Sequence, residues 1–266
     1  MTRTLDCQRD GALLRIQLDR PELHNAFNAD MIAELTATLR EADTDNGIRA
    51  VILGGNGKSF SAGADLNWMR GMAAFSEAEN REDSMRLAEL MRTLDSLSKP
   101  TIARVNGAAF GGGVGLIACC DIAVGVDTAL FGLTEVRLGL VPAVISPYVV
   151  AAIGARASRR LFLTGERFDA ASAARIGLLH EVVPAEHLDA TVDGIAGDLA
   201  RGGPQALDEA KRLVARIAAG RDDVASTDAE NAALIARLRV STEGQEGLTA
   251  FFERRNAGWI NAPDPS

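Results

Sequence analysis

A helix, a short apolar run and a glycine-rich loop follow one another twice in this chain, and this recurrence constrains the fold most. In the first unit, AVIL at 50–53 leads into GGNGKSFSAGAD at 54–65. In the second, TIARV at 101–105 leads into NGAAFGGGVG at 106–115. Short apolar runs that end in glycine-rich loops are typical of buried parallel strands, because both faces of such strands are covered. The recurrence therefore predicts an α/β fold wound from parallel strands.

The segments around the two units complete this prediction. Alternating apolar residues predict a hairpin over residues 5–18, with its turn at Asp10 and Gly11. An apolar pattern at helical spacing begins at Met31, behind a cap at Asn28 or Asp30, and should end near residues 45–47. Further short strands are expected at 121–125, 129–133 and 178–184. After the break RGGP at 201–204 the chain is alanine-rich and helical, so we predict a core of residues 1–202 and a C-terminal helical subdomain of residues 203–266.

Charge and composition argue against several classes of partner. The net charge of −8 gives no electrostatic footprint for nucleic acid or for an anionic membrane. The three histidines lack the spacing of metal ligands, and Cys7, Cys119 and Cys120 form neither a disulfide framework nor a zinc motif. The start of the chain lacks the apolar region of a signal peptide, and no apolar run is long enough to span a bilayer. We therefore expect a cytoplasmic protein without a bound metal.

The two glycine-rich loops are the first candidates for chemistry. In FSAGADLNWM at 60–69, small residues let a ligand approach the main chain and leave N–H groups as donors. In AAFGGGVGL at 108–116, three glycines precede a helix-like stretch, and a helix N-terminus stabilises developing negative charge. Each loop alone is equally consistent with a tight turn. The second is a poor match to the glycine fingerprint of dinucleotide binding.

Several motifs, spread over nearly the whole chain, resemble those of the crotonase, or enoyl-CoA hydratase/isomerase, superfamily. They are R-P-x-x-x-N-A at 20–26, F-S-A-G-A-D at 60–65, K-P-T-I-A-R-V-N-G-A-A-F-G-G-G at 99–113, C-D-I-A at 120–123, F-G-L-T-E-V-R-L-G-L-V-P at 131–142 and A-F-F-E-R-R at 250–255. The resemblance implies an α/β fold with a crotonase-like ββα spiral core and a C-terminal helical subdomain that forms homotrimers or hexamers. It also implies an acyl-CoA thioester as substrate, with coenzyme A as part of that substrate and no separate cofactor.

The same resemblance assigns catalytic roles. The backbone N–H groups of Ala64 and Gly112 would form an oxyanion hole around the thioester oxygen, and Glu135 would be the main acid/base. Hydratases of the family normally carry a second glutamate two residues after the triple glycine, where this chain has Gly115. Glu135 would therefore perform both proton transfers or work with a partner that the sequence does not identify.

Substrate-binding residues are carried over in the same way: Ala26, Ala62, Asp65, Leu66, Met69, Gly115 and Pro142, with Phe251 and Arg254 from the C-terminal helices. After Pro142 the chain has AVISPYVV where many members carry a run like G-A-G-G-T-Q-R-L, which predicts a different wall of the acyl pocket. The combination is most similar to bacterial hydratases of glutaconyl-CoA-type substrates, such as 3-methylglutaconyl-CoA in leucine degradation or its isoprenoid relatives.

A substrate of that type has a distal carboxylate, which needs a cation or N–H donors in the pocket. By sequence neighbourhood, Arg70, Arg104 and Arg137 are candidates for this role, although a surface or structural arginine is the simpler interpretation of each. Trp68 and Tyr148 are candidates for lining the pocket or for the core.

Three functions stay open at this point. The first is an enoyl-CoA hydratase, which adds water across the double bond of a 2-enoyl-CoA. The second is an enoyl-CoA isomerase, for which one glutamate that shuttles a proton between carbons is sufficient. The third is a non-catalytic acyl-CoA-binding protein; RNA binding is disfavoured by the acidic balance.

Overall fold

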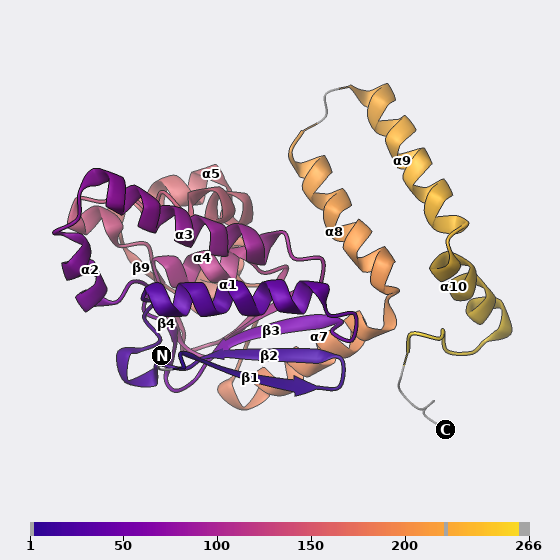
Figure 1. Cartoon of the computed structure of the whole chain (residues 1–266), viewed down its shortest axis with the longest axis horizontal. Helices are drawn as coiled ribbons and strands as arrows, with labels where there is room; N and C mark the ends of the chain where they lie inside the picture. The colour runs from indigo at the N-terminus through magenta and orange to yellow at the C-terminus, as the bar shows by residue number, and fades with distance from the viewer. Residues whose placement is uncertain (1–2, 221–222, 261–266) are drawn as a thin grey trace.

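The computed structural model describes residues 3–220 and 223–260, and its strands form two sheets (Figure 1). In spatial order, the larger sheet consists of β1 (Leu5–Asp10), β2 (Leu13–Leu18), β3 (Ala50–Gly55), β5 (Thr101–Val105), β7 (Ile122–Val126) and β10 (Glu181–Val183). The smaller sheet consists of β4 (Ser59–Ser61), β6 (Ala108–Phe110), β8 (Leu130–Gly132) and β9 (Arg167–Asp169). All neighbours from β2 to β10 in the larger sheet are parallel. The predicted parallel winding is confirmed.

The predicted hairpin is the one antiparallel pair of the larger sheet. β1 and β2 pair from Leu5↔Leu18 to Asp10↔Leu13, and Gly11 occupies the turn. The strand β3 has all six of its residues buried, which explains why its sequence is a continuous apolar run rather than an alternating one.

Each recurring unit of the sequence folds as two strands followed by one or two helices. β3 and β4 lead to α2 (Leu66–Met72) and α3 (Glu77–Asp95), and β5 and β6 lead to α4 (Gly112–Cys119). β7 and β8 lead in turn to the 3-10 helix η2 (Glu135–Leu138) and to α5 (Ser146–Thr164). Because the first strand of each unit joins the larger sheet and the second joins the smaller one, the chain winds as the predicted ββα spiral. The two glycine-rich loops consequently leave neighbouring strands of the smaller sheet.

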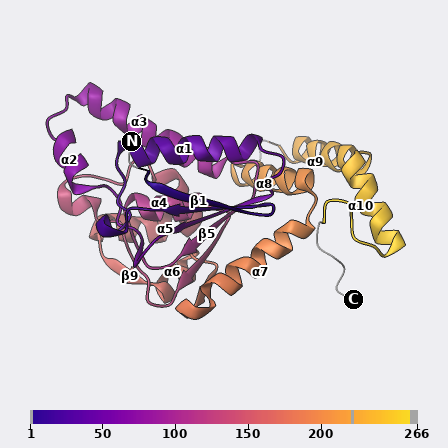
Figure 2. The same cartoon turned by 60° about the horizontal axis from the view of Figure 1, so that its bottom comes forward.

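Helices cover both faces of the larger sheet (Figures 1 and 2). On one face lie α1 (Ala29–Thr44) and α3, which pack against each other, and on the other lies α7 (Leu188–Arg201), which contacts β3, β5 and β7. Asn28 caps α1 by accepting a hydrogen bond from the N–H of Met31. The remaining short elements are η1 (Pro21–Leu23), α6 (Ala170–Ile176) and η3 (Ala185–His187).

The C-terminal helices α8 (Pro204–Ala218), α9 (Val224–Arg239) and α10 (Thr242–Glu253) extend from the edge of this body, on the side opposite α2 (Figures 1 and 2). An ion pair of 2.9 Å between Lys211 and Asp121 holds α8, and Arg49 donates to the carbonyl of Gly202 at 2.5 Å. Phe251 and Phe252 are each 76% exposed. The division at residue 202 stays a prediction, and residues 221–222 and 261–266 of the predicted subdomain lie outside the described residues. Within the described chain, no helix is both long and apolar enough to cross a membrane.

Candidate active site

The two glycine-rich loops meet at Gly63 and Gly112. A Cβ atom at Gly63 would lie 3.7 Å from the backbone nitrogen of Gly112 and only 2.8 Å from the carbonyl oxygen of Phe110. Gly63 also has φ +84°, a backbone conformation that L side chains rarely adopt. Glycine is therefore required here for two independent reasons, and it brings the backbone of Ala64 next to the start of α4.

The N–H groups of Ala64 and Gly112 are both unoccupied. Ala64 forms a parallel bridge with Phe27, in which the N–H of Phe27 donates to Gly63 at 2.7 Å and the N–H of Asp65 donates to Phe27 at 2.8 Å. The N–H of Ala64 itself takes part in neither of these bonds. Gly112 is the first residue of α4, where the helix provides no acceptor for its N–H. Across residues 3–220 and 223–260, neither N–H group donates a hydrogen bond.

Arg20 and Asp65 fix the loop that carries Ala64. The Arg20 guanidinium pairs with the Asp65 carboxylate at 2.7 Å and donates to the carbonyl of Ala26 at 2.6 Å. The other oxygen of Asp65 accepts from the N–H groups of Asn67 and Trp68 at the start of α2. Burial alone would raise the pKa of Asp65, but the hydrogen bonds from Arg20 and from these N–H groups lower it overall.

Asn25 completes this support, and sequence reasoning gave it no role. It is fully buried with φ +55°, and its amide nitrogen donates to the carbonyls of Asn56 and Ser59 at 2.9 and 2.8 Å. Its side-chain oxygen accepts from the N–H of Arg20 at 3.0 Å. The R-P-x-x-x-N-A motif was the available signal, because it holds both residues that tie this loop down.

Glu135 lies on the other side of the second loop, at the first position of η2. Its Oε1 would lie 2.9 Å from a Cβ atom placed on Gly111. Gly111 is the residue directly before Gly112, which carries the free N–H. Its Oε2 is buried without a hydrogen-bond partner among the described residues. Burial raises the pKa of Glu135, and a hydrogen bond from its own backbone N–H offsets only part of that effect. A carboxylate whose pKa is raised in this way is suited to accept and return protons.

Gly115 faces a space that is already filled. A Cβ atom at this position would overlap the side chain of Ile145 and lie 3.3 Å from Cε of Met91. Ile145 and Met91 are 3% and 0% exposed. The place of the family's second glutamate is therefore occupied by apolar side chains, and no carboxylate can enter it without repacking.

The structure brings most of the predicted binding residues to this region. Ala26 and Ala62 take part, through their backbone, in the hydrogen bonds that support the loop. Leu66 and Met69 lie on α2, directly after the loop, and Leu66 is 71% exposed. Pro142 is buried, seven residues after Glu135. The structure does not bring Phe251 and Arg254 of the same chain to the site, because α10 and its C-cap lie at the opposite end of the molecule from α2 (Figures 1 and 2).

The candidate cations differ in availability. Arg104 already forms an ion pair with Asp189 at 2.5 Å. Arg70 is exposed on α2 and donates to Asn67, and Arg137 is exposed on η2 beside Gly165. Trp68 and Tyr148 are partly buried against the core. No group of three or more potential metal ligands occurs in the described part of the chain.

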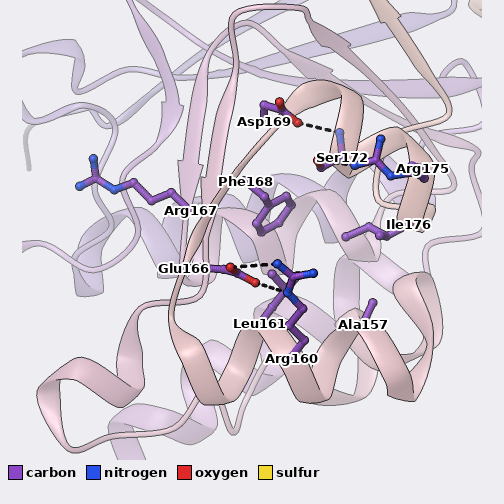
Figure 3. A pocket seen from close by; sticks show the side chains of 10 residues that line it. All are labelled: Ala157, Arg160, Leu161, Glu166, Arg167, Phe168, Asp169, Ser172, Arg175 and Ile176. Atoms are coloured by element: carbon purple, nitrogen blue, oxygen red, sulfur yellow. Dashed lines mark hydrogen bonds and ion pairs between the residues drawn. The ribbon is translucent and has the colours of Figure 1, made fainter.

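A separate pocket lies between α5, β9 and α6 (Figure 3). Arg160 and Glu166 form an ion pair there at 2.5 Å, and Asp169 caps α6 by accepting from the N–H of Ser172 at 2.8 Å. Arg167 points away from them, with its guanidinium 5.3 Å from the centre of the Phe110 ring. None of the predicted site residues lines this pocket.

Two free main-chain donors beside a buried carboxylate are typical of enzymes that stabilise an oxyanion while a proton moves. Residues 8–262 match the family model described as enoyl-CoA hydratase/isomerase, and the chain belongs to this family, within the crotonase superfamily. A solved enoyl-CoA hydratase from Shewanella pealeana is 45% identical with a TM-score of 0.94, covering 97% of this chain and 96% of its own.

Two curated relatives have more specific names. A crotonyl-CoA hydratase from Syntrophomonas wolfei is 33% identical over 96% of this chain and 96% of its own length. A short-chain-enoyl-CoA hydratase from Clostridium acetobutylicum is 31% identical over 93% of this chain and 94% of its own length.

Proposed function

We propose that this protein is an enoyl-CoA hydratase. The observation that carries the proposal is the unpartnered, buried Oε2 of Glu135 beside the unoccupied N–H groups of Ala64 and Gly112. The names of the relatives from S. wolfei and C. acetobutylicum support the same activity.

In the proposed reaction, the thioester oxygen of a 2-enoyl-CoA accepts hydrogen bonds from the two N–H groups. Glu135 takes a proton from water as the water oxygen attacks C3, and the electron pair of the double bond moves towards C2 and the thioester oxygen. The enolate then takes the proton back from Glu135 at C2, so water is added and the carboxylate is regenerated. Each oxyanion donor in such a site contributes about 3 kcal/mol to transition-state stabilisation.

For the acyl group, we propose a 3-methylglutaconyl-CoA-type substrate of leucine degradation. Arg70 supports this, because it is exposed on the helix that follows Ala64, whereas Arg104 is already paired. Coenzyme A would lie along Ala62 and Leu66, and it would be the only cofactor-like group required.

Phe251 and Arg254 would reach coenzyme A only from a neighbouring chain. We therefore propose a homotrimer or hexamer in which the exposed face of α10, including Phe251 and Phe252, packs on another copy. The predicted cytoplasmic location and the boundary at residue 202 belong to the same proposal.

An enoyl-CoA isomerase is the second candidate, and the filled space at Gly115 favours it. Isomerisation needs one carboxylate, and the described site provides one. A non-catalytic acyl-CoA-binding protein would bind thioesters without changing them.

Incubation with 2-enoyl-CoA and 3-enoyl-CoA thioesters, followed by mass spectrometry, separates the three functions. Hydration adds the mass of water to a 2-enoyl-CoA and removes its absorbance, whereas isomerisation moves the double bond of a 3-enoyl-CoA without a change in mass. The panel includes short, long and dicarboxylic acyl chains, with Glu135→Gln as the control that should be inactive. Binding without turnover across the whole panel would contradict the proposed function.

A further inference from the structure

Asp83, on α3, is a buried carboxylate that has no partner. Among the described residues, Asp65 and Asp83 are the two carboxylate residues with less than a tenth of their surface exposed, at 6% and 7%. Asp65 is neutralised by Arg20, but Asp83 makes no hydrogen bond or ion pair within the described chain. Arg86, the cation that acts on Asp83 electrostatically, is bound to Glu82 at 2.7 Å. Neither carboxylate oxygen of Asp83 is among the fully enclosed, unpartnered side-chain atoms of the described residues, so the carboxylate lies in a largely covered place that still opens to solvent. Ionisable groups in such surroundings are concentrated at functional sites.

Asp83 lies on the face of α3 that packs on the molecule. It precedes Leu87, Leu90 and Leu94 by four, seven and eleven residues, so all four lie on one face of the helix. Leu90 and Leu94 are 1% and 0% exposed. Asp83 therefore occupies the end of the apolar stripe by which α3 packs on the molecule.

The end of that stripe lies beyond the N-terminus of α4. Met91 approaches Gly115, and its sulfur is 3.7 Å from that of Cys119; Asp95, one turn further, acts electrostatically on Cys119. The two helices thus run in the same direction. Asp83 lies eight residues, about 12 Å, before Met91, whereas Gly112 lies three residues, about 4.5 Å, before Gly115.

Along the helix axes, Asp83 therefore lies about 7.5 Å beyond the N-terminus of α4, the end that carries the free N–H of Gly112. The first turns of α3 lie beside α2 in both views, and α2 follows directly on Ala64 (Figures 1 and 2). The beginning of α3 and α2 thus lie next to the loop that carries Ala64.

We propose that Asp83 is the second carboxylate of the active site, supplied from α3 in place of the glutamate that Gly115 lacks. The inference rests on the proposed hydratase function. The attacking water donates one hydrogen bond to Glu135 and the other to Asp83, which directs an oxygen lone pair at C3. The water proton still passes to Glu135 and from there to C2, so Asp83 starts and ends the cycle as a carboxylate and the balance of atoms is unchanged.

The test compares Asp83→Asn with Asp95→Asn in the full-length protein. Asp95 is a carboxylate at the other end of the same helix, and its pKa is also raised by burial, so it is a matched control. Two reactions are measured: hydration of 2-butenoyl-CoA, and exchange of the C2 protons of butanoyl-CoA with D₂O. Exchange requires the oxyanion hole and Glu135 but no attacking water.

We expect Asp83→Asn to lower kcat for hydration by at least 30-fold while exchange stays within threefold of wild type. Its urea midpoint should be equal to or above that of wild type, because a carboxylate whose charge is disfavoured by partial burial has been removed. Asp95→Asn should leave both reactions unchanged, and Glu135→Gln should lose both.

Unchanged hydration by Asp83→Asn, or an equal loss of hydration and exchange, would overturn the role of Asp83. Failure of the wild type to hydrate any enoyl-CoA would appear before the variants are compared, and it would overturn the proposed function together with this inference.

Discussion

Gly115→Glu restores the carboxylate that the family's hydratases normally carry, and the structure predicts that it fails. A Cβ atom there would overlap Ile145, whose own Cβ is 2.9 Å away, and would press on Met91. Overpacking of this kind costs about 1–3 kcal/mol, and a buried carboxylate without a partner adds a similar amount. Replacing a helical glycine returns about 1 kcal/mol. We therefore expect a net loss of about 3 kcal/mol in the free energy of unfolding.

Urea unfolding measures this loss, with Gly115→Ala as the matched control. Alanine introduces the same Cβ atom without the carboxylate, so the difference between the two variants isolates the added charge and length. The double variant Gly115→Glu/Ile145→Ala should lose less free energy of unfolding than the two single variants lose together. The reason is that Ile145→Ala removes the side chain that overlaps the new Cβ atom. We expect no gain in kcat for Gly115→Glu.

Two results would refute the reasoning. One is a Gly115→Glu variant as stable as wild type, which would mean that Ile145 does not fill this space. The other is a rise in kcat, which would mean that the site is an incomplete form of the usual two-glutamate centre.

Four further predictions concern Glu135 and the first glycine-rich loop. Glu135→Gln should lower kcat by about 10²–10⁴-fold. The same variant should have a free energy of unfolding about 1 kcal/mol higher at neutral pH, because a buried, unpartnered charge is removed. A variant less stable than wild type would contradict this. Because burial raises the pKa of Glu135, the acid limb of kcat/KM should lie above pH ~4.3. The stability difference between wild type and Glu135→Gln should shrink as the pH falls through that raised pKa, since the folded wild type then binds a proton; a difference that widens would have the wrong sign. Gly63→Ala should cost at least 1 kcal/mol in urea unfolding, because of its φ of +84° and the nearby carbonyl of Phe110.

Local patterns were sufficient to predict much of the fold. The strand TIARV is β5 at the predicted residues, the hairpin turns at Gly11, and Asn28 caps α1. These features depend on a period, a turn residue or a cap, which are all properties of neighbouring residues. The same local patterns did not predict the conformation of the long loops between these elements.

The arrangement around the site depends on contacts between distant residues, and the sequence alone could not supply them. Arg20 pairs with Asp65, and Ile145 fills the space at Gly115, across separations of 45 and 30 residues. The low exposure of Asp83 depends in the same way on how α3 packs. Glu135 was predicted from a motif, but the lack of any partner for its Oε2 follows only from the packing around it.

The central claim is that the N–H groups of Ala64 and Gly112 polarise a thioester carbonyl. Isotope-edited infrared spectroscopy of 2-butenoyl-CoA labelled with ¹³C at the carbonyl, bound to the inactive Glu135→Gln variant, tests it directly. Two hydrogen bonds to the carbonyl oxygen should weaken its double bond, so we predict that the band shifts to lower wavenumber than for the free thioester in water. A bound thioester whose carbonyl band stays at the free frequency would contradict the account.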